Sequence, residues 1–227
     1  MHPPLQANNM NLKHLKSLLL GTSAFVCLAL AAPVLAADFT ITSGTTTNDG
    51  NTVNGNDTVA VTGALATTGA NEGIDTTGGT NAVSVSEAGS IETAGGGAFG
   101  IFNNGGRNAT TVSGSIETAG EAAYGIFNGV GDGNATTVSG SITTTGDIAR
   151  GILTIGDSNQ TNFSGSITTT GDTGHGIFNF GDSNQTTVSG IMKTGGNLAY
   201  GIYNRGDDNT TTISGTVSAT GTDASAL

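Results

Sequence analysis

The residues of this sequence that could do chemistry are few, and the most regular of them are aspartates. Turns that read GDGN, GDSN, GDSN and GDDN recur every 25 residues and contain Asp132, Asp157, Asp182 and Asp207. Carboxylates held close together repel one another, and a hard cation with oxygen ligands relieves that repulsion. A row of calcium sites is therefore one hypothesis. The other is that Gly-Asp-x-Asn is ordinary turn chemistry, with the acids separated by water.

A second candidate is a position whose residue type varies while its neighbours stay constant. It is occupied in turn by Phe99, Tyr124, Arg150, His175 and Tyr200. Such variation is typical of a solvent-facing position, and aromatic residues beside arginine are typical of binding surfaces. We therefore predict that Tyr124, Arg150, His175 and Tyr200 form a ligand stripe for a glycan or for a host or cell-surface protein. The adjacent row is expected to pack in the interior: Phe102, Phe127, Leu153, Phe178 and Tyr203.

Few residues of this sequence could take part in catalysis. His175 is the only histidine after residue 37, and Cys27 is the only cysteine of the chain. A His/Cys metal cluster is therefore excluded, and a Ser-His-Asp site would have to use a position that elsewhere holds tyrosine or arginine. We expect no enzyme activity, no catalytic residue and no cofactor apart from the calcium hypothesis. A carbohydrate-active β-helix enzyme is kept as an alternative.

The charge of the chain restricts its partners. After residue 37, four basic residues stand against 17 acidic ones, a formal charge of −13. A surface this acidic repels phosphate backbones and anionic lipid. We expect neither nucleic-acid binding nor direct membrane insertion of the mature segment.

Residues 1–36 have the pattern of a secretory signal peptide. Lys13 and Lys16 precede an apolar run, and Val34 and Ala36 place small residues at −3 and −1 of a cleavage site. An uncleaved membrane anchor is the alternative, although the apolar run is short for one. Export through the inner membrane follows from this pattern. Because Cys27 lies in the apolar run, the mature chain should contain no thiol and no disulfide.

Residues 37–227 are repetitive, with a period of 25 residues and one extra residue near 128–130. Full units begin at Thr110, Thr136, Thr161 and Thr186, with a shortened unit at Thr211 and fainter copies before Thr110. A period of this length indicates a solenoid, and the frequent glycines argue against helices. Val112, Gly114 and Ile116 alternate with polar residues, as in a strand. The sequence predicts an all-β, right-handed parallel β-helix of about seven coils, the end ones partial, with about 25 residues per coil.

Stacked coils place equivalent residues above one another as ladders. We expect three interior stacks: Val112, Val138, Phe163, Val188 and Ile213; Ile116, Ile142, Ile167, Met192 and Val217; and Ile126, Ile152, Ile177 and Ile202. Asparagine amides should hydrogen-bond along a further ladder of Asn108, Asn134, Asn159, Asn184 and Asn209. A recurring glycine marks a turn that needs positive φ or close packing: Gly120, Gly146, Gly171, Gly196 and Gly221.

The signal peptide, the acidic cysteine-free coils and units of the type S-G-S-I-x-T-x-G…G-I-F-N…G-D-x-N resemble the passenger domains of autotransporters of Gram-negative bacteria. The resemblance covers about residues 38–227. It implies a surface-displayed or secreted β-helix, adhesive or structural and non-catalytic, that a translocator β-barrel carries to the outer membrane. No barrel-like series of strands follows the repeats, so we expect a fragment of a longer passenger. A stalk or spacer with no ligand of its own is the alternative function.

Overall fold

A computed structural model of the protein describes residues 39–41, 46–47, 51–54 and 57–227. The regular structure in these ranges is entirely β, and it consists of 23 strands of up to four residues. No helix long and apolar enough to span a membrane is found among them. The predicted signal peptide, residues 1–36, lies outside the described residues.

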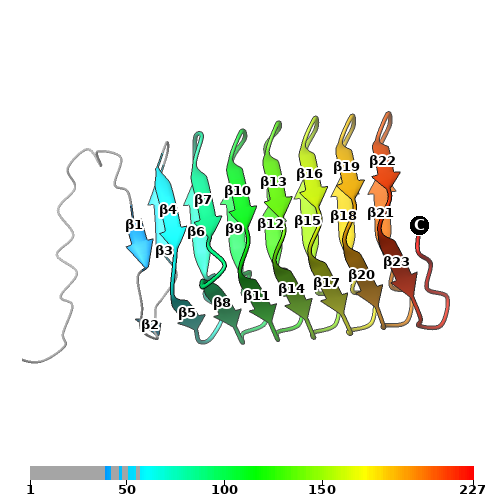
Figure 1. The fold of residues 1–227 in the computed structure, drawn as a ribbon, viewed down its shortest axis with the longest axis horizontal. Coiled ribbons are helices and arrows are strands. Elements are labelled where there is room, and N and C mark those ends of the chain that lie inside the picture. The colour runs from blue at the N-terminus through cyan, green and yellow to red at the C-terminus, as the bar shows by residue number, and fades with distance from the viewer. Residues whose placement is uncertain (1–38, 42–45, 48–50, 55–56) are drawn as a thin grey trace, which may run out of the picture. The chain divides into compact units, whose positions relative to one another are not determined.

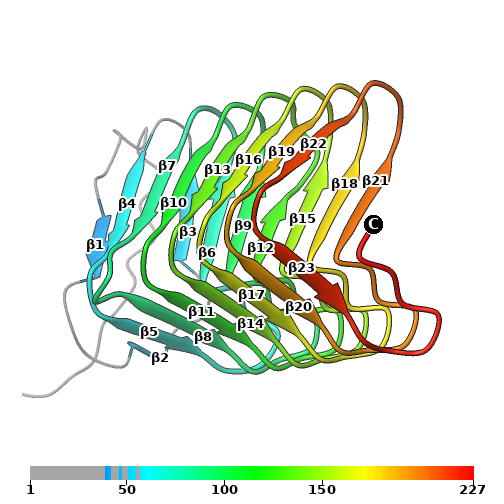
Figure 2. The same cartoon turned by 45° about the vertical axis from the view of Figure 1, so that its right-hand side comes forward.

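Each strand pairs in parallel with the strands three places before and after it, so the strands form three sheets (Figures 1 and 2). Sheet A contains β1 (Phe39–Ile41), β4 (Thr58–Val61), β7 (Ala82–Val85), β10 (Ala109–Val112), β13 (Ala135–Val138), β16 (Gln160–Phe163), β19 (Gln185–Val188) and β22 (Thr210–Ile213). Sheet B contains β2 (Thr46–Thr47), β5 (Ala64–Thr67), β8 (Ser90–Thr93), β11 (Ser115–Thr118), β14 (Ser141–Thr144), β17 (Ser166–Thr169), β20 (Ile191–Thr194) and β23 (Thr216–Ala219). Sheet C contains β3 (Asn51–Asn54), β6 (Ile74–Thr77), β9 (Ile101–Asn104), β12 (Ile126–Asn128), β15 (Ile152–Ile155), β18 (Ile177–Phe180) and β21 (Ile202–Arg205).

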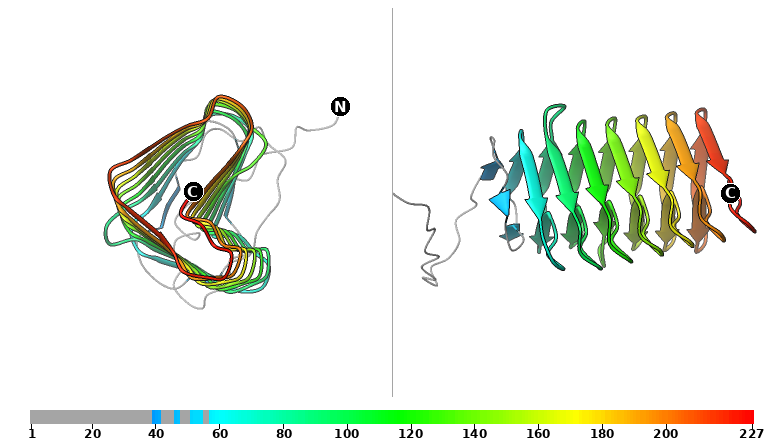
Figure 3. Two further views of the ribbon diagram at one scale, coloured as in Figure 1. Left: turned by 90° about the vertical axis from the view of Figure 1, so that its right-hand side faces the viewer. Right: turned by 90° about the horizontal axis from the view of Figure 1, so that it is seen from below.

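One strand from each sheet makes one coil, and the coils superimpose as a three-sided outline when viewed along the stack (Figure 3). The strands from β4 to β21 make six complete coils; β1 to β3 precede them, and β22 and β23 begin another. Val112 pairs with Val138, and Val138 pairs with Phe163, so the register absorbs the one extra residue between β12 and β13. The predicted parallel β-solenoid with about 25 residues per coil is confirmed.

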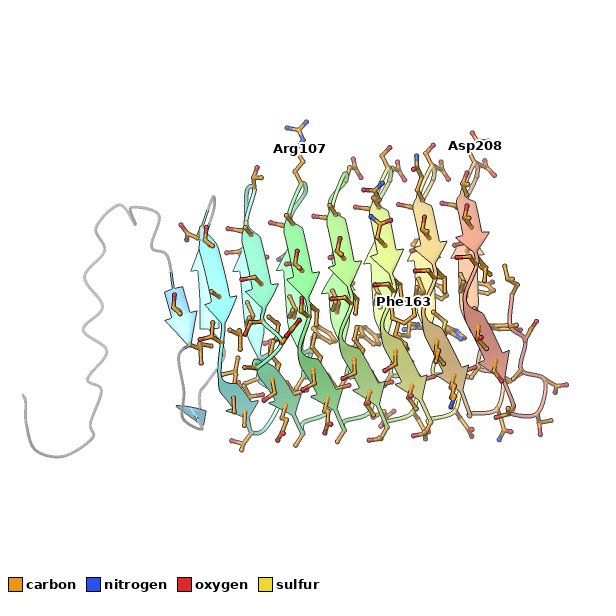
Figure 4. The ribbon with its side chains drawn as sticks, viewed as in Figure 1. Arg107, Phe163 and Asp208 are labelled. Atoms are coloured by element: carbon orange, nitrogen blue, oxygen red, sulfur yellow. The ribbon has the colours of Figure 1, made fainter. Side chains whose placement is uncertain are left out.

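The three predicted interior stacks lie inside the coils. Val112, Ile116 and Ile126 are fully buried, as are their counterparts in the next coils, and Ile213 and Val217 pack against this core at its end. The alternation of apolar and polar residues directs each of these side chains inward. Phe163 is the largest of them, and it lies within the stack in Figure 4, whereas Arg107 and Asp208 point away from the turns.

A polar ladder also runs through the interior, and the sequence reasoning missed it. Asn103 Nδ2 donates to Thr110 Oγ1 at 2.9 Å and to Asn128 Oδ1 at 2.8 Å, which links sheet C to sheet A and one coil to the next. Asn179 repeats this arrangement with Thr186 and Asn204. Buried amides must find partners. The coil repeat supplies those partners, so asparagine fits in an otherwise apolar interior.

The predicted turn ladder of asparagines is present, with a different bonding pattern. The Asn108 N–H donates to Asn134 Oδ1 at 2.9 Å, and the Asn134 N–H donates to Asn159 Oδ1 at 2.7 Å. The side-chain oxygens therefore satisfy backbone donors of the preceding coil. The recurring turn glycines are explained by close packing, because a Cβ on Gly146 would lie 1.9 Å from the Gly120 carbonyl oxygen.

Candidate functional site

The outer side of sheet C collects almost every aromatic ring of residues 57–227. Eight of the nine phenylalanines and tyrosines in this range lie there, and Phe163 alone is interior. Two arginines and the histidine join them, so this surface is unlike the threonine- and alanine-rich outer side of sheet A. We call the following residues the aromatic face: Phe99, Phe102, Tyr124, Phe127, Arg150, Leu153, His175, Phe178, Phe180, Tyr200, Tyr203 and Arg205.

A glycine in each coil places two rows of this face on the same side. A Cβ on Gly125 would lie 2.3 Å from Ile142 Cγ2, so this position points into the core. The next residue, Ile126, also points inward and is fully buried. Two consecutive inward positions leave Tyr124 and Phe127 together on the outside. The prediction that the row of Phe127 packs in the interior is therefore wrong. Of that row only Leu153 is buried, at 5% exposure.

The rings stack on one another along the direction in which the coils repeat. Phe99 lies on Tyr124 with ring centres 5.0 Å apart and planes 9° apart, and Phe102 lies on Phe127 at 4.9 Å and 19°. Edge-to-face contacts at 5.1 to 5.6 Å join the two rows. Such pairs contribute roughly 0.5–1.5 kcal/mol each beyond the area that they bury. Each ring covers the flat side of its neighbour, so mainly ring edges and tyrosine hydroxyls remain for a partner.

A second cluster of rings occupies the coils nearer the C-terminus. His175 stacks on Phe178 with centres 5.5 Å apart, and Phe178 stacks on Tyr203 at 5.0 Å. Tyr200 contacts both His175 and Tyr203 at 5.3 Å. The contacts between its two rows are stacked or tilted, at 14° to 33°, and not edge-to-face as in the first cluster. Rings nevertheless occupy the same two repeat positions, so the aromatic face is a repeated feature of the solenoid.

Arg150 connects the two clusters. Its guanidinium carbon lies 5.2 Å from the centre of the Tyr124 ring and 4.7 Å from that of Phe178, and its Nη1 donates to the Tyr124 hydroxyl at 3.0 Å. Arg205 lies over Phe180 at 5.2 Å in the same way. Cation–π contacts of this kind hold a guanidinium flat against the surface while it keeps its charge.

His175 is more deeply placed than a solvent-facing position allows. Its side chain is 8% exposed, and Nδ1 accepts the Tyr200 backbone N–H at 3.0 Å, so the neutral ring carries its proton on Nε2. Burial and, to a smaller extent, the Arg150 charge together lower the pKa of His175 from its ordinary value of 6.5 to about 4. The expectation of a solvent-facing position is wrong for His175. Tyr124, Arg150 and Tyr200 are half-buried, and all four predicted stripe residues do lie on one face.

The four aspartates of the Gly-Asp-x-Asn turns are exposed and form a hydrogen-bonded ladder. Asp132 Oδ1 accepts the Asp157 N–H at 2.8 Å, Asp157 Oδ1 accepts the Asp182 N–H at 2.8 Å, and Asp182 Oδ1 accepts the Asp207 N–H at 2.7 Å. No group of three or more His, Cys, Asp or Glu side chains within the described ranges is placed to hold a metal ion. The ladder gives the aspartates a structural role, and calcium binding stays a prediction.

A matching ladder in the turn between sheets B and C escaped the sequence reasoning. Asp147 Oδ1 accepts the Asp172 N–H at 2.9 Å, Asp172 Oδ1 accepts the Asn197 N–H at 2.8 Å, and Asn197 Oδ1 accepts the Thr222 N–H at 3.0 Å. The clue was available, because an Asp or Asn follows the turn glycines Gly146, Gly171 and Gly196 in each of these coils.

A shallow groove of about 740 Å³ follows the corner between sheets A and B. Serines such as Ser113, Ser139 and Ser164 line it, with Gly140 and Gly165 between them. Glu87 is the one ionisable residue among those that line it. General acid–base catalysis needs a titratable side chain positioned beside the reacting group, and Glu87 is the one candidate in this lining. The groove is separate from the aromatic face.

Comparison of the chain with the models of known protein families, with curated proteins and with solved structures gives no match.

Proposed function

We propose that the chain is the β-helical passenger segment of an autotransporter-type exported protein, displayed on or released from a Gram-negative cell. Its work is adhesive and non-catalytic, and the aromatic face is its adhesive surface. The parallel solenoid and the secretory pattern of residues 1–36 support the first part. A translocator β-barrel in a longer chain would carry it to the outer membrane.

The observation that carries the adhesive role is the segregation of the aromatic residues. A spacer needs only to stack its coils, and the outer side of sheet A does so with alanine, threonine and glutamine at Ala135, Thr137 and Gln160. Sheet C instead exposes rings and guanidinia, and Phe180 remains 43% exposed. Tyrosine and arginine are enriched in the energetically dominant parts of protein interfaces, whereas rows of exposed rings add nothing to solubility.

The geometry favours a protein partner over a glycan. Sugars bind aromatic residues by lying on the flat side of a ring, and in this structure neighbouring rings cover those sides at 4.9 to 5.0 Å. Ring edges, the Tyr124 hydroxyl and the Arg205 guanidinium are the groups left for a partner. Such groups suit the mixed polar and apolar surface of a protein.

The test is binding of the purified protein to host cells, with Tyr124→Ala and Tyr200→Ala on the aromatic face and Thr137→Ala and Thr187→Ala on sheet A as matched controls. The face variants should lose most binding at unchanged circular dichroism, and the sheet A variants should keep it. Equal binding by all four would place adhesion elsewhere, and no binding by the parent protein would favour a stalk or spacer. Inhibition by free polysaccharide, and not by cell-surface protein, would favour a glycan partner.

A further inference from the structure

The two ends of the aromatic face differ in charge. Asp75 pairs with Phe102 in the register of sheet C, so it occupies the same outward row one coil earlier. Glu72 occupies the row of Phe99, because the next residue, Gly73, donates its N–H to the Phe99 carbonyl just as Gly100 donates to Tyr124. The face therefore begins with two acids and ends with Arg205, with rings and Arg150 between them.

At the acidic end, the hydrogen bonding of the carboxyl groups is incomplete within the described part of the chain. Asp75 Oδ1 is buried and has no hydrogen-bond partner. Burial and the neighbouring Glu72 both raise the pKa of Asp75, which means that both disfavour the ionised form of this carboxyl. At the other end Arg205 is exposed, and its guanidinium lies over the Phe180 ring. A cation near Glu72 and Asp75 and an anion near Arg205 would each relieve an imbalance.

A second copy of the same face supplies both. When the two faces meet with their solenoid axes antiparallel, the acidic end of each copy lies against the tyrosines and Arg205 of the other. In the middle of the face, Arg150 of each copy lies opposite the coil of Tyr124. The parallel arrangement sets acid against acid and arginine against arginine. A two-fold interface uses one patch twice, so the patch must be complementary to itself when reversed, and this face is.

We propose that the aromatic face pairs with the aromatic face of a second copy, with the two solenoid axes antiparallel. This rests on the proposed function, in which that face is the adhesive surface, and it names the protein partner as the chain itself. Along the stack the face spans six coils that are ~4.8 Å apart, and along the strands it spans two steps of ~6.6 Å between outward residues. Its flat footprint is therefore on the order of 400 Å² per copy. The two copies together bury about 800 Å², which is less than the roughly 1,200 Å² of stable specific interfaces, so the pairing is weak and transient and depends on concentration, with a Kd in the micromolar range or above.

The experiment is sedimentation of the protein over roughly 1 to 200 μM, concentrations that bracket a micromolar Kd. Arg205→Glu sets like charges against each other in the dimer and should weaken pairing roughly tenfold, as should Glu72→Lys. The double variant restores opposite charges across the interface and should recover most of the affinity. Lys193→Glu, on the outer side of sheet B, makes the same change in net charge as Arg205→Glu and should leave pairing near the parent value.

A protein that stays monomeric over this range overturns self-pairing. Equal weakening by Arg205→Glu and Lys193→Glu, or a double variant no better than either single one, also overturns it. The adhesive role is judged separately. If the monomeric protein still binds host cells, and Tyr124→Ala and Tyr200→Ala abolish that binding, the proposed function stands and only the identity of the partner is wrong.

Discussion

Arg150 lies between Tyr124 and Phe178, with its guanidinium carbon 5.2 Å and 4.7 Å from the two ring centres, and its Nη1 donates to the Tyr124 hydroxyl at 3.0 Å. In the coils on either side this repeat position holds Tyr124 and His175. A planar guanidinium can take the place of a ring in a stack because it presents a flat surface of similar thickness. Arg150 therefore continues the aromatic rows across a coil that has no ring of its own.

Replacing Arg150 should separate the two ring clusters. Arg150→Ala removes two cation–π contacts and one hydrogen bond, and we expect a loss of about 1–2 kcal/mol in the free energy of unfolding. Arg150→Lys should recover only part of this, because an ammonium group cannot stack on both rings. Urea unfolding would measure it, with Lys193→Ala as an exposed control. Equal stability of Arg150→Lys and the parent protein would show that charge alone matters at this position.

His175 makes the stability of the solenoid depend on pH. The pKa of His175 is about 4 in the folded chain against 6.5 in the unfolded one, so between these values the unfolded state binds the proton and the folded state does not. Stability from this residue is fully present above about pH 6.5 and is lost as the pH falls towards 4, by at most about 3 kcal/mol.

The matched variant is His175→Gln, whose side-chain oxygen can still accept the Tyr200 N–H but does not titrate. The melting temperatures of the two proteins should converge with falling pH, because only the parent loses this contribution. Titration of the many acids affects both proteins alike and cancels in the comparison. A difference that stays constant from pH 7 to pH 4 would contradict the assignment.

The sequence predicts the solenoid and its three interior stacks because a 25-residue period aligns equivalent residues whatever the local conformation. It does not predict which side Phe127 takes. Simple alternation from an outward Tyr124 would place Phe127 in the interior. Only the close approach of Gly125 to Ile142 inserts a second inward position and so turns Phe127 outward. The burial of His175 was equally hidden, because rings of the neighbouring coil cover it. The interior pairing of Asn103 with Thr110 depends on two sheets meeting across the core.

Two adjacent glycines offer a direct test of how tightly the coils stack. A Cβ on Gly196 would lie 1.9 Å from the Gly171 carbonyl oxygen, whereas one on Gly195 would meet nothing nearer than 3.8 Å. Gly196→Ala should therefore cost about 2 kcal/mol or more, since the coils must move apart to accept it. Gly195→Ala should change stability by about 0.5 kcal/mol at most, because its φ is not in the left-handed region. Thermal unfolding of the two variants would measure both, and similar losses would mean that the spacing of the coils is looser than described.

In the aspartate ladder the Asp182 carboxylate both accepts a backbone hydrogen bond and carries a negative charge, and substitutions can separate these two roles. Asp182 Oδ1 accepts the Asp207 N–H, and the Asp182 N–H donates to Asp157 Oδ1. Asp182→Asn keeps the accepting oxygen and removes one of several like charges, so it should preserve or raise the melting temperature at low salt. Asp182→Ala removes the acceptor as well and should lower it. Under the calcium hypothesis, calcium raises the melting temperature of the parent protein at low salt and does so less for Asp182→Asn. If calcium shifts neither protein, the carboxylates serve the turn alone, and the row of metal sites is discarded.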